Sequence, residues 1–235
     1  MLMKTLINSG YILLFYVLII QKVSAQNVTG VEQLPFNIVA AVNDTNKPMI
    51  VYITGDGGWN SFSKKLCGFL ALKGYPVVAL NARSYFWQKK SIAQTTLDIA
   101  RLTRVYQKTW NRKKIVLVGY SFGSEIIPFV FNTLPAAISS QVLNLCLVSP
   151  APFTDFEIHI SALLGFGVSK GDNVVSEINK ISTKPVTLIF GNDENDFPVS
   201  RLKIKNFTNT RLKGGHHYEG DEATLCNTIV QHIPI

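Results

Sequence analysis

The sequence predicts an α/β fold: a mostly parallel central sheet with helices on both of its faces. Short apolar runs recur along the chain at the length of buried strands, and amphipathic segments separate them. Strands that are apolar on both faces are typical of a parallel sheet that helices cover, because water reaches neither face. The 235 residues fit one domain of this kind better than two, and we expect that domain to cover residues 26–235.

Each expected strand is an apolar run bounded by glycine, proline or polar residues. In chain order the expected strands cover residues 38–42, 49–53, 77–80, 115–118, 142–148, 186–190 and 207–212. The second run ends at a glycine-rich segment, and the fourth leads directly into Gly119. Both places are therefore candidates for loops that approach a ligand closely.

The expected helices carry apolar side chains at helical spacing. They cover residues 61–73, a long segment after the N-cap Ser91, 125–134 and 223–229. Gly74 ends the first helix, and Pro128 is expected in or near the first turn of the third. The segment 150–184 breaks the alternation, and long segments of this kind in α/β enzymes often cover the site.

The first 25 residues have the pattern of a cleavable secretory signal peptide. Lys4 precedes ten apolar residues at 11–20, and the sequence Val23-Ser24-Ala25 supplies small residues for cleavage. Ten helical residues span about 15 Å, half the thickness of a bilayer core, which argues against a membrane anchor. We expect cleavage after Ala25 and export, which in a Gram-negative bacterium means the periplasm.

Charge and cysteine content narrow the classes of partner. The formal net charge is +8, and loss of Lys4 and Lys22, the two charged residues of the signal, leaves +6. No run of lysine and arginine interleaved with aromatic residues occurs, so the charge favours anionic lipid head groups over nucleic acid. No Cys/His spacing suggests zinc, and we expect no metal or other cofactor.

The segment Gly119-Tyr120-Ser121-Phe122-Gly123 matches G-x-S-x-G between an apolar run and a helix. In this context the motif is typical of the nucleophile elbow of an α/β-hydrolase, with Ser121 as nucleophile. The oxyanion hole should combine the Phe122 N–H with a second N–H, from Asp56 or Gly57, in the loop after residues 49–53. The first and last helices of that fold pack on the same face, which leaves a Cys67–Cys226 disulfide open.

The serine needs a base and an acid, which follow it in the order acid, then histidine. His216, directly after two glycines, is the preferred base, and His217 is the alternative. Three acids compete in the loop after residues 186–190. The usual spacing from Gly191 favours Glu194, with Asp196 second and Asp193 third.

Five segments in the same order resemble the bacterial VirJ/AcvB virulence-protein family. They are GDGGW at 55–59, YFW at 85–87, GYSFGSEIIPF at 119–129, FEIH at 156–159 and GGHHY at 214–218. The resemblance implies a periplasmic α/β-hydrolase with Ser121 as nucleophile and a base in the pair His216-His217. AcvB-type members hydrolyse the aminoacyl ester of lysyl-phosphatidylglycerol, and VirJ is linked to type IV secretion.

The leading prediction is therefore an exported serine esterase that removes the aminoacyl group from this membrane phospholipid. Asp56 is the candidate carboxylate for the substrate ammonium, and Tyr85 and Trp87 are candidate aromatic faces for it. One alternative is a non-catalytic periplasmic factor whose partners are components of a secretion system. Another is a general esterase or lipase, because the fold does not fix the substrate.

Overall fold

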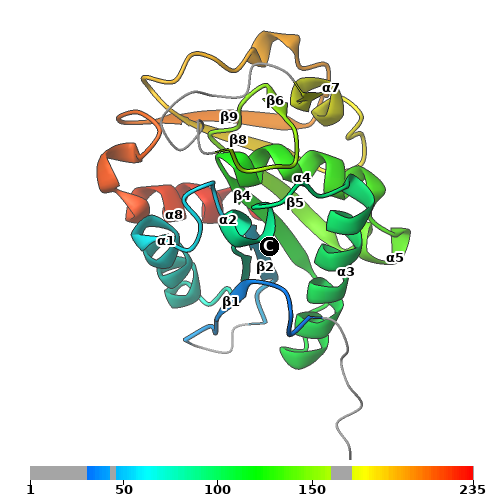
Figure 1. The fold of residues 1–235 in the computed structure, drawn as a ribbon. Helices are drawn as coiled ribbons and strands as arrows, with labels where there is room; N and C mark the ends of the chain where they lie inside the picture. Colours follow the sequence, from blue (N-terminus) through cyan, green and yellow to red (C-terminus); the bar gives the residue numbers. More distant parts are fainter. Residues whose placement is uncertain (1–30, 43–45, 160–170, 235) are drawn as a thin grey trace, which may run out of the picture.

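The computed structural model describes residues 31–42, 46–159 and 171–234, so the predicted signal peptide lies outside the described residues. Seven strands form one sheet in the order β1-β3-β2-β4-β5-β8-β9, and all neighbouring strands except β1 and β3 are parallel (Figure 1). The strands are β1 Phe36–Val39, β2 Met49–Ile53, β3 Val77–Leu80, β4 Ile115–Tyr120, β5 Val142–Val148, β8 Val186–Gly191 and β9 Phe207–Leu212. This confirms the predicted fold class.

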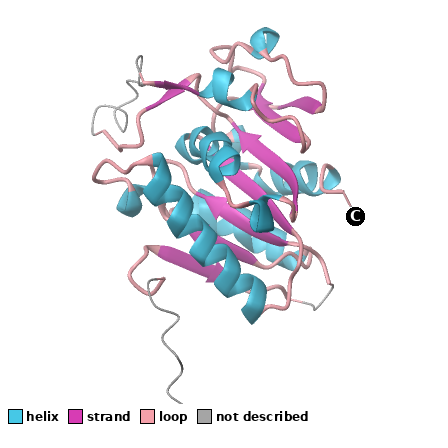
Figure 2. Cartoon of the chain, turned by 90° about the vertical axis from the view of Figure 1, so that its right-hand side faces the viewer, coloured by secondary structure: helices cyan, strands magenta, loops and turns pink. Residues whose placement is uncertain are grey.

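Helices cover both faces of the sheet (Figures 1 and 2). The long helices are α1 Ser61–Leu72, α3 Ile92–Thr109, α4 Phe122–Thr133 and α8 Glu222–Gln231. Helices α1 and α8 pack together on one face, and α3 and α4 pack on the other. The shorter elements are α2 Ala82–Tyr85, α5 Ala136–Ser139, α7 Val174–Ile178, the paired strands β6 Phe153–Thr154 and β7 Asp172–Asn173, and the 3-10 turns Val199–Arg201 and Tyr218–Gly220.

The sheet separates two apolar cores, and alternate residues of β2 show the division. Val51 and Ile53 pack with α3 and α4, whereas Ile50 and Tyr52 pack with α1 and α8. All five residues of β2 are buried, as are all residues of β3, β4 and β8. Burial on both faces explains why apolar runs in the sequence locate these strands so well.

Three expectations about the elements need correction. The first strand covers Phe36–Val39 rather than 38–42, because only these residues pair with β3. Helix α4 begins at Phe122, so Pro128 lies in its second turn and removes one intrahelical hydrogen bond there. The segment 150–184 contains β6, β7 and α7, and residues 160–170 within it lie outside the described residues.

The cysteines are buried thiols. Cys67 on α1 and Cys226 on α8 lie on helices that pack together, but both are free, as is Cys146 in β5, so the structure contains no Cys67–Cys226 disulfide. Burial, and then the neighbouring Cys226, raise the pKa of the Cys67 thiol. No helix in the described part of the chain is long and apolar enough to cross a bilayer.

Candidate active site

Ser121 lies on a strained turn between β4 and α4. Its φ of 51° and ψ of −124° are values that a non-glycine residue rarely adopts. The turn is so tight that a Cβ atom at Gly119 would lie 2.5 Å from the Gly123 backbone, and one at Gly123 would collide with the carbonyl oxygen of Ile53 on β2. The two glycines of the motif therefore let strand and helix approach closely enough to project Ser121 from the end of β4.

A line of hydrogen bonds joins Ser121 to His216 and Glu194. The Ser121 Oγ lies 2.8 Å from His216 Nε2, and His216 Nδ1 lies 2.7 Å from Glu194 Oε1. Because the carboxylate accepts from Nδ1–H, the Nε2 atom is left to accept the serine proton. Ser121 follows β4, Glu194 lies in the loop after β8, and His216 lies in the loop after β9.

The Glu194 carboxylate is held by further donors. Its Oε2 accepts hydrogen bonds from the Gly191 N–H at 2.6 Å and from the Ser149 hydroxyl at 2.7 Å. Burial raises the pKa of Glu194, but the hydrogen bonds from His216, Gly191 and Ser149 outweigh burial and leave the pKa below its usual value. The Arg211 guanidinium fixes the loop by donating to the carbonyl oxygens of Gly191 and Glu194, at 2.9 and 2.6 Å.

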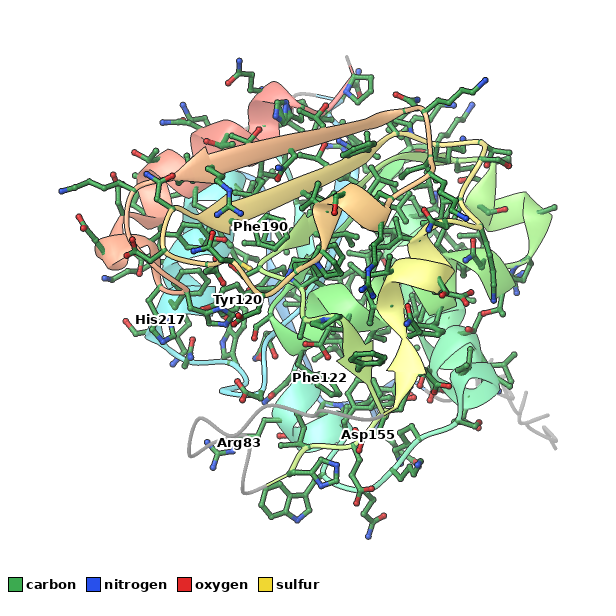
Figure 3. The ribbon with its side chains drawn as sticks, turned by 90° about the horizontal axis from the view of Figure 1, so that it is seen from above. Arg83, Tyr120, Phe122, Asp155, Phe190 and His217 are labelled. Atoms are coloured by element: carbon green, nitrogen blue, oxygen red, sulfur yellow. The ribbon has the colours of Figure 1, made fainter. Side chains whose placement is uncertain are left out.

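The alternative residues occupy other positions. His217 Nδ1 lies 2.9 Å from the Tyr120 hydroxyl, which donates to the carbonyl oxygen of His216 at 2.9 Å (Figure 3). His217 thus braces the loop that carries His216. In the part of the chain that the structure describes, neither Asp193 nor Asp196 is hydrogen-bonded to either histidine.

The loop after β2 passes against Ser121, as the predicted oxyanion hole requires. A Cβ atom at Gly55 would lie 3.3 Å from Ser121 Cβ, and the Gly58 N–H closes a turn to the Gly55 carbonyl at 2.9 Å. The N–H groups of Asp56, Gly57 and Phe122 have no acceptor among the described residues. They remain available to a ligand oxygen.

The two aromatic candidates for substrate contact differ in exposure. Tyr85 is buried, its hydroxyl donates to Asp98 at 2.6 Å, and its ring packs edge-on against Phe86. The expectation that Tyr85 presents a free aromatic face therefore needs correction, since its neighbours occupy that face. Trp87 is 52% exposed.

The bacterial virulence protein (VirJ) family matches residues 47–234. This chain belongs to that family. The match covers the strand before the glycine-rich loop, the elbow, and the loops that carry Glu194 and His216. No curated protein sequence gives a significant match to the chain.

Solved structures share the fold of this VirJ-family chain at low sequence identity. MenH from S. aureus is 15% identical with a TM-score of 0.63, over 83% of this chain and 96% of that one. A lipase-esterase related protein from Clostridium acetobutylicum is 16% identical with a TM-score of 0.60, over 85% and 99%. Est1E from Butyrivibrio proteoclasticus, with ferulic acid bound, is 15% identical with a TM-score of 0.58, over 84% and 94%. The likeness shows an α/β-hydrolase fold.

In this VirJ-family chain the serine opens onto a cavity of about 180 Å³. Its lining residues are Ser121, Glu125, Ser149, Pro150, Ala151, Pro152, Phe190, Glu194, Asp196, Phe197 and His216. Sequence reasoning missed Glu125, although its position four residues after the nucleophile is a signal that could have found it, since such residues share a helix face.

A second, polar groove of about 560 Å³ shares Pro152 and Asp196 with this cavity. Arg201 and Lys203 line the groove, and neither is in an ion pair within the described residues. The backbone between them is fixed by Asn179, whose side chain bonds the Arg201 carbonyl and the Lys203 N–H. Among the same residues no group of three or more His, Cys, Asp or Glu could hold a metal ion.

Proposed function

We propose that this protein is a serine hydrolase of carboxylic esters, with Ser121 as nucleophile, His216 as general base and Glu194 as the acid that orients His216. The observation that carries the proposal is the unbroken hydrogen-bonded line from Ser121 Oγ through His216 to Glu194. A serine hydroxyl is a weak nucleophile unless an adjacent base takes its proton, and this arrangement supplies that base.

The proposed reaction has two halves. Ser121 Oγ attacks the ester carbonyl as its proton passes to His216 Nε2, and the negative oxygen is met by the N–H of Phe122 and an N–H from Asp56 or Gly57. His216 then gives the proton to the leaving alcohol, so an acyl-serine remains. Water, deprotonated by His216, attacks the acyl-serine and releases the acid and Ser121.

We further propose lysyl-phosphatidylglycerol as the substrate. A cavity of about 180 Å³ is smaller than the ~300–1,000 Å³ of typical ligand pockets, so it suits a short acyl group better than a fatty acyl chain. The aminoacyl group carries positive charge, and the cavity is lined by acids. The phosphate of the leaving alcohol would meet Arg201 and Lys203 in the adjoining groove. Export after cleavage at Ala25 would bring residues 26–235 to the membrane that holds this lipid.

The test is the release of lysine from lysyl-phosphatidylglycerol in vesicles by purified residues 26–235, with Ser121→Ala as the matched control. We expect release by the wild type and a loss of at least a thousandfold in the variant, since the nucleophile is removed. A fluorophosphonate probe is applied in parallel.

The outcomes separate the parts of the proposal. Labelling of Ser121 without release of lysine would keep the hydrolase and discard this lipid, in favour of a general esterase. Neither labelling nor release would overturn the hydrolase and favour a non-catalytic factor for secretion.

A further inference from the structure

Glu125 is a buried carboxyl beside the candidate nucleophile. It lies four residues after Ser121 on α4, and its N–H donates to the Ser121 carbonyl at 3.3 Å. Its exposed fraction is 8%, and it lines the same cavity as Ser121. An acyl group attached to Ser121 Oγ would therefore enter a space that contains this carboxyl.

The surroundings of Glu125 are acidic. Burial raises its pKa to about 8, the Thr154 hydroxyl and the Ala151 N–H act in the opposite direction, and the charges of Asp56 and Asp155 raise the pKa further. Among the residues that the structure describes, no lysine or arginine lines the cavity at Ser121.

Other buried carboxylates in the described residues have cationic partners. Glu177 is paired with Lys180, Glu222 with Lys65 at 3.5 Å, and Asp98 with Arg101 at 3.6 Å. Glu125 has no such partner among them. Without a cation the ionised form of this carboxyl is costly in the cavity, so its position points to a cation that arrives with a ligand and lets it ionise.

We propose that Glu125 is a specificity residue that binds the ammonium group of a cationic acyl moiety while Ser121 attacks the ester. This inference rests on the proposed ester hydrolase and assigns the recognition of the acyl charge to a residue outside the triad. Charge-assisted hydrogen bonds to a carboxylate are the strong ones, and exclusion of water makes them stronger. Asp56 then adds to the negative potential around the ammonium.

The test compares two soluble esters with the same six-carbon acyl chain. Lysine methyl ester carries two amines, and methyl hexanoate carries none. For Glu125→Gln we expect kcat/KM on the lysine ester to fall roughly 10- to 100-fold, the loss of one hydrogen bond to a charged group. On methyl hexanoate we expect less than a twofold change. Glu125→Asp should recover part of the loss, and Glu222→Gln, which removes a buried carboxyl elsewhere, should leave both rates unchanged.

A binding measurement keeps this inference separate from the proposed function. Lysinamide and hexanamide are titrated calorimetrically against Ser121→Ala and against Ser121→Ala with Glu125→Gln, so no turnover is needed. We expect lysinamide to bind at least tenfold more weakly when Glu125 is replaced, and hexanamide to be unaffected. Equal losses for both amides, or for both esters, would overturn the charge-reading role and make Glu125 a structural residue. If lysinamide behaves as expected but no ester is cleaved, the proposed hydrolase fails and the cation site stands.

Discussion

Two glutamates lie beside the same serine, and their surroundings differ sharply. Glu194 accepts hydrogen bonds from Gly191, Ser149 and His216, and its pKa lies below the usual value for a carboxyl. Glu125 is more deeply buried, lies near Asp56 and Asp155, and has a pKa raised to about 8. Of these two glutamates, Glu194 is thus ionised and fixed by its donors, whereas Glu125 has a raised pKa and no cationic partner among the described residues.

These different surroundings suit the two carboxyls to two tasks in one cavity. A carboxylate that orients a histidine must stay charged through the reaction, and three donors provide for that. A carboxyl that binds a cationic group of a ligand must have no cationic partner before the ligand arrives, because a lysine or arginine already paired with it would compete with the ligand. Pairs of carboxyls whose surroundings separate their pKa values commonly divide roles in this way.

The largest effect that tests the comparison is expected from Glu194→Gln. The amide keeps the shape but can leave His216 in the wrong tautomer, so kcat should fall on the order of 10³- to 10⁴-fold with every ester. Glu125→Gln should instead slow the cleavage of cationic esters and leave the cleavage of neutral esters nearly unchanged. The measurement is kcat on lysine methyl ester and methyl hexanoate.

Asp193→Asn is the matched control for Glu194→Gln, because it removes a carboxylate of the same loop that is not hydrogen-bonded to His216. Its rates should stay within twofold of the wild type. A Glu194→Gln enzyme that keeps a tenth of its activity, or an equal loss in Asp193→Asn, would contradict the assignment of the acid to Glu194.

The second effect concerns stability and its dependence on pH. The folded pKa of Glu125, about 8, lies above the 4.5 of an ordinary glutamate. The contribution of Glu125 to the free energy of unfolding is therefore fully present below pH 4.5. It falls as the pH rises to about 8, because the carboxyl ionises in the unfolded chain first. Glu125→Gln removes this loss, so its Tm at pH 8.5 should exceed that of the wild type by at least ~5 °C, since each kcal/mol shifts the Tm of a domain of this size by ~2–4 °C.

Thermal unfolding at pH 5 and pH 8.5 makes this measurement, and the gain should be larger at pH 8.5. Glu222→Gln replaces a carboxyl that is already paired with Lys65 and should give no such gain. Equal Tm values for the wild type and Glu125→Gln at pH 8.5 would show that burial and the nearby carboxylates do not disfavour the ionised form of Glu125.

Local sequence predicted the sheet and the elbow well, because both depend on neighbours along the chain. Strands buried on both faces are mostly apolar, which is why the sequence predicts the bounds of β2 and β5 to the residue. Gly119 is needed because the Gly123 backbone lies against it within the same five-residue motif, whereas Gly123 is needed because β2 approaches it at Ile53. By contrast, the spacing from Gly191 only favours Glu194 over the two other acids of its loop, and the hydrogen bonds from His216 and Ser149, 22 and 45 residues away, distinguish it.

Tertiary contacts also explain what the sequence did not reveal. Tyr85 follows a strand at the edge where ligands bind in α/β folds, which made it a substrate candidate. It is buried because Asp98, on the next helix, accepts from its hydroxyl. The position of Glu125 four residues after Ser121 indicates the side of α4 on which it lies, but only the packing of α4 shows that this side borders the cavity.

The smallest effect is expected from Ser149→Ala, which gives Glu194 fewer hydrogen-bond donors and so makes its surroundings slightly more like those of Glu125. Ser149→Ala removes one of the three donors to the Glu194 carboxylate, so we expect kcat to fall about fivefold to tenfold, the value of one such hydrogen bond. Because the pKa of Glu194 is lowered, its stabilising contribution is present above the unfolded pKa and is lost as the pH falls through the folded one. The Tm loss of Ser149→Ala should therefore be larger at pH 7 than at pH 3. Thr103→Ala, which removes a buried hydroxyl from α3, controls for packing and should leave kcat unchanged. A Tm loss of equal size at both pH values would mean that Ser149 supports the fold and not the charge of Glu194.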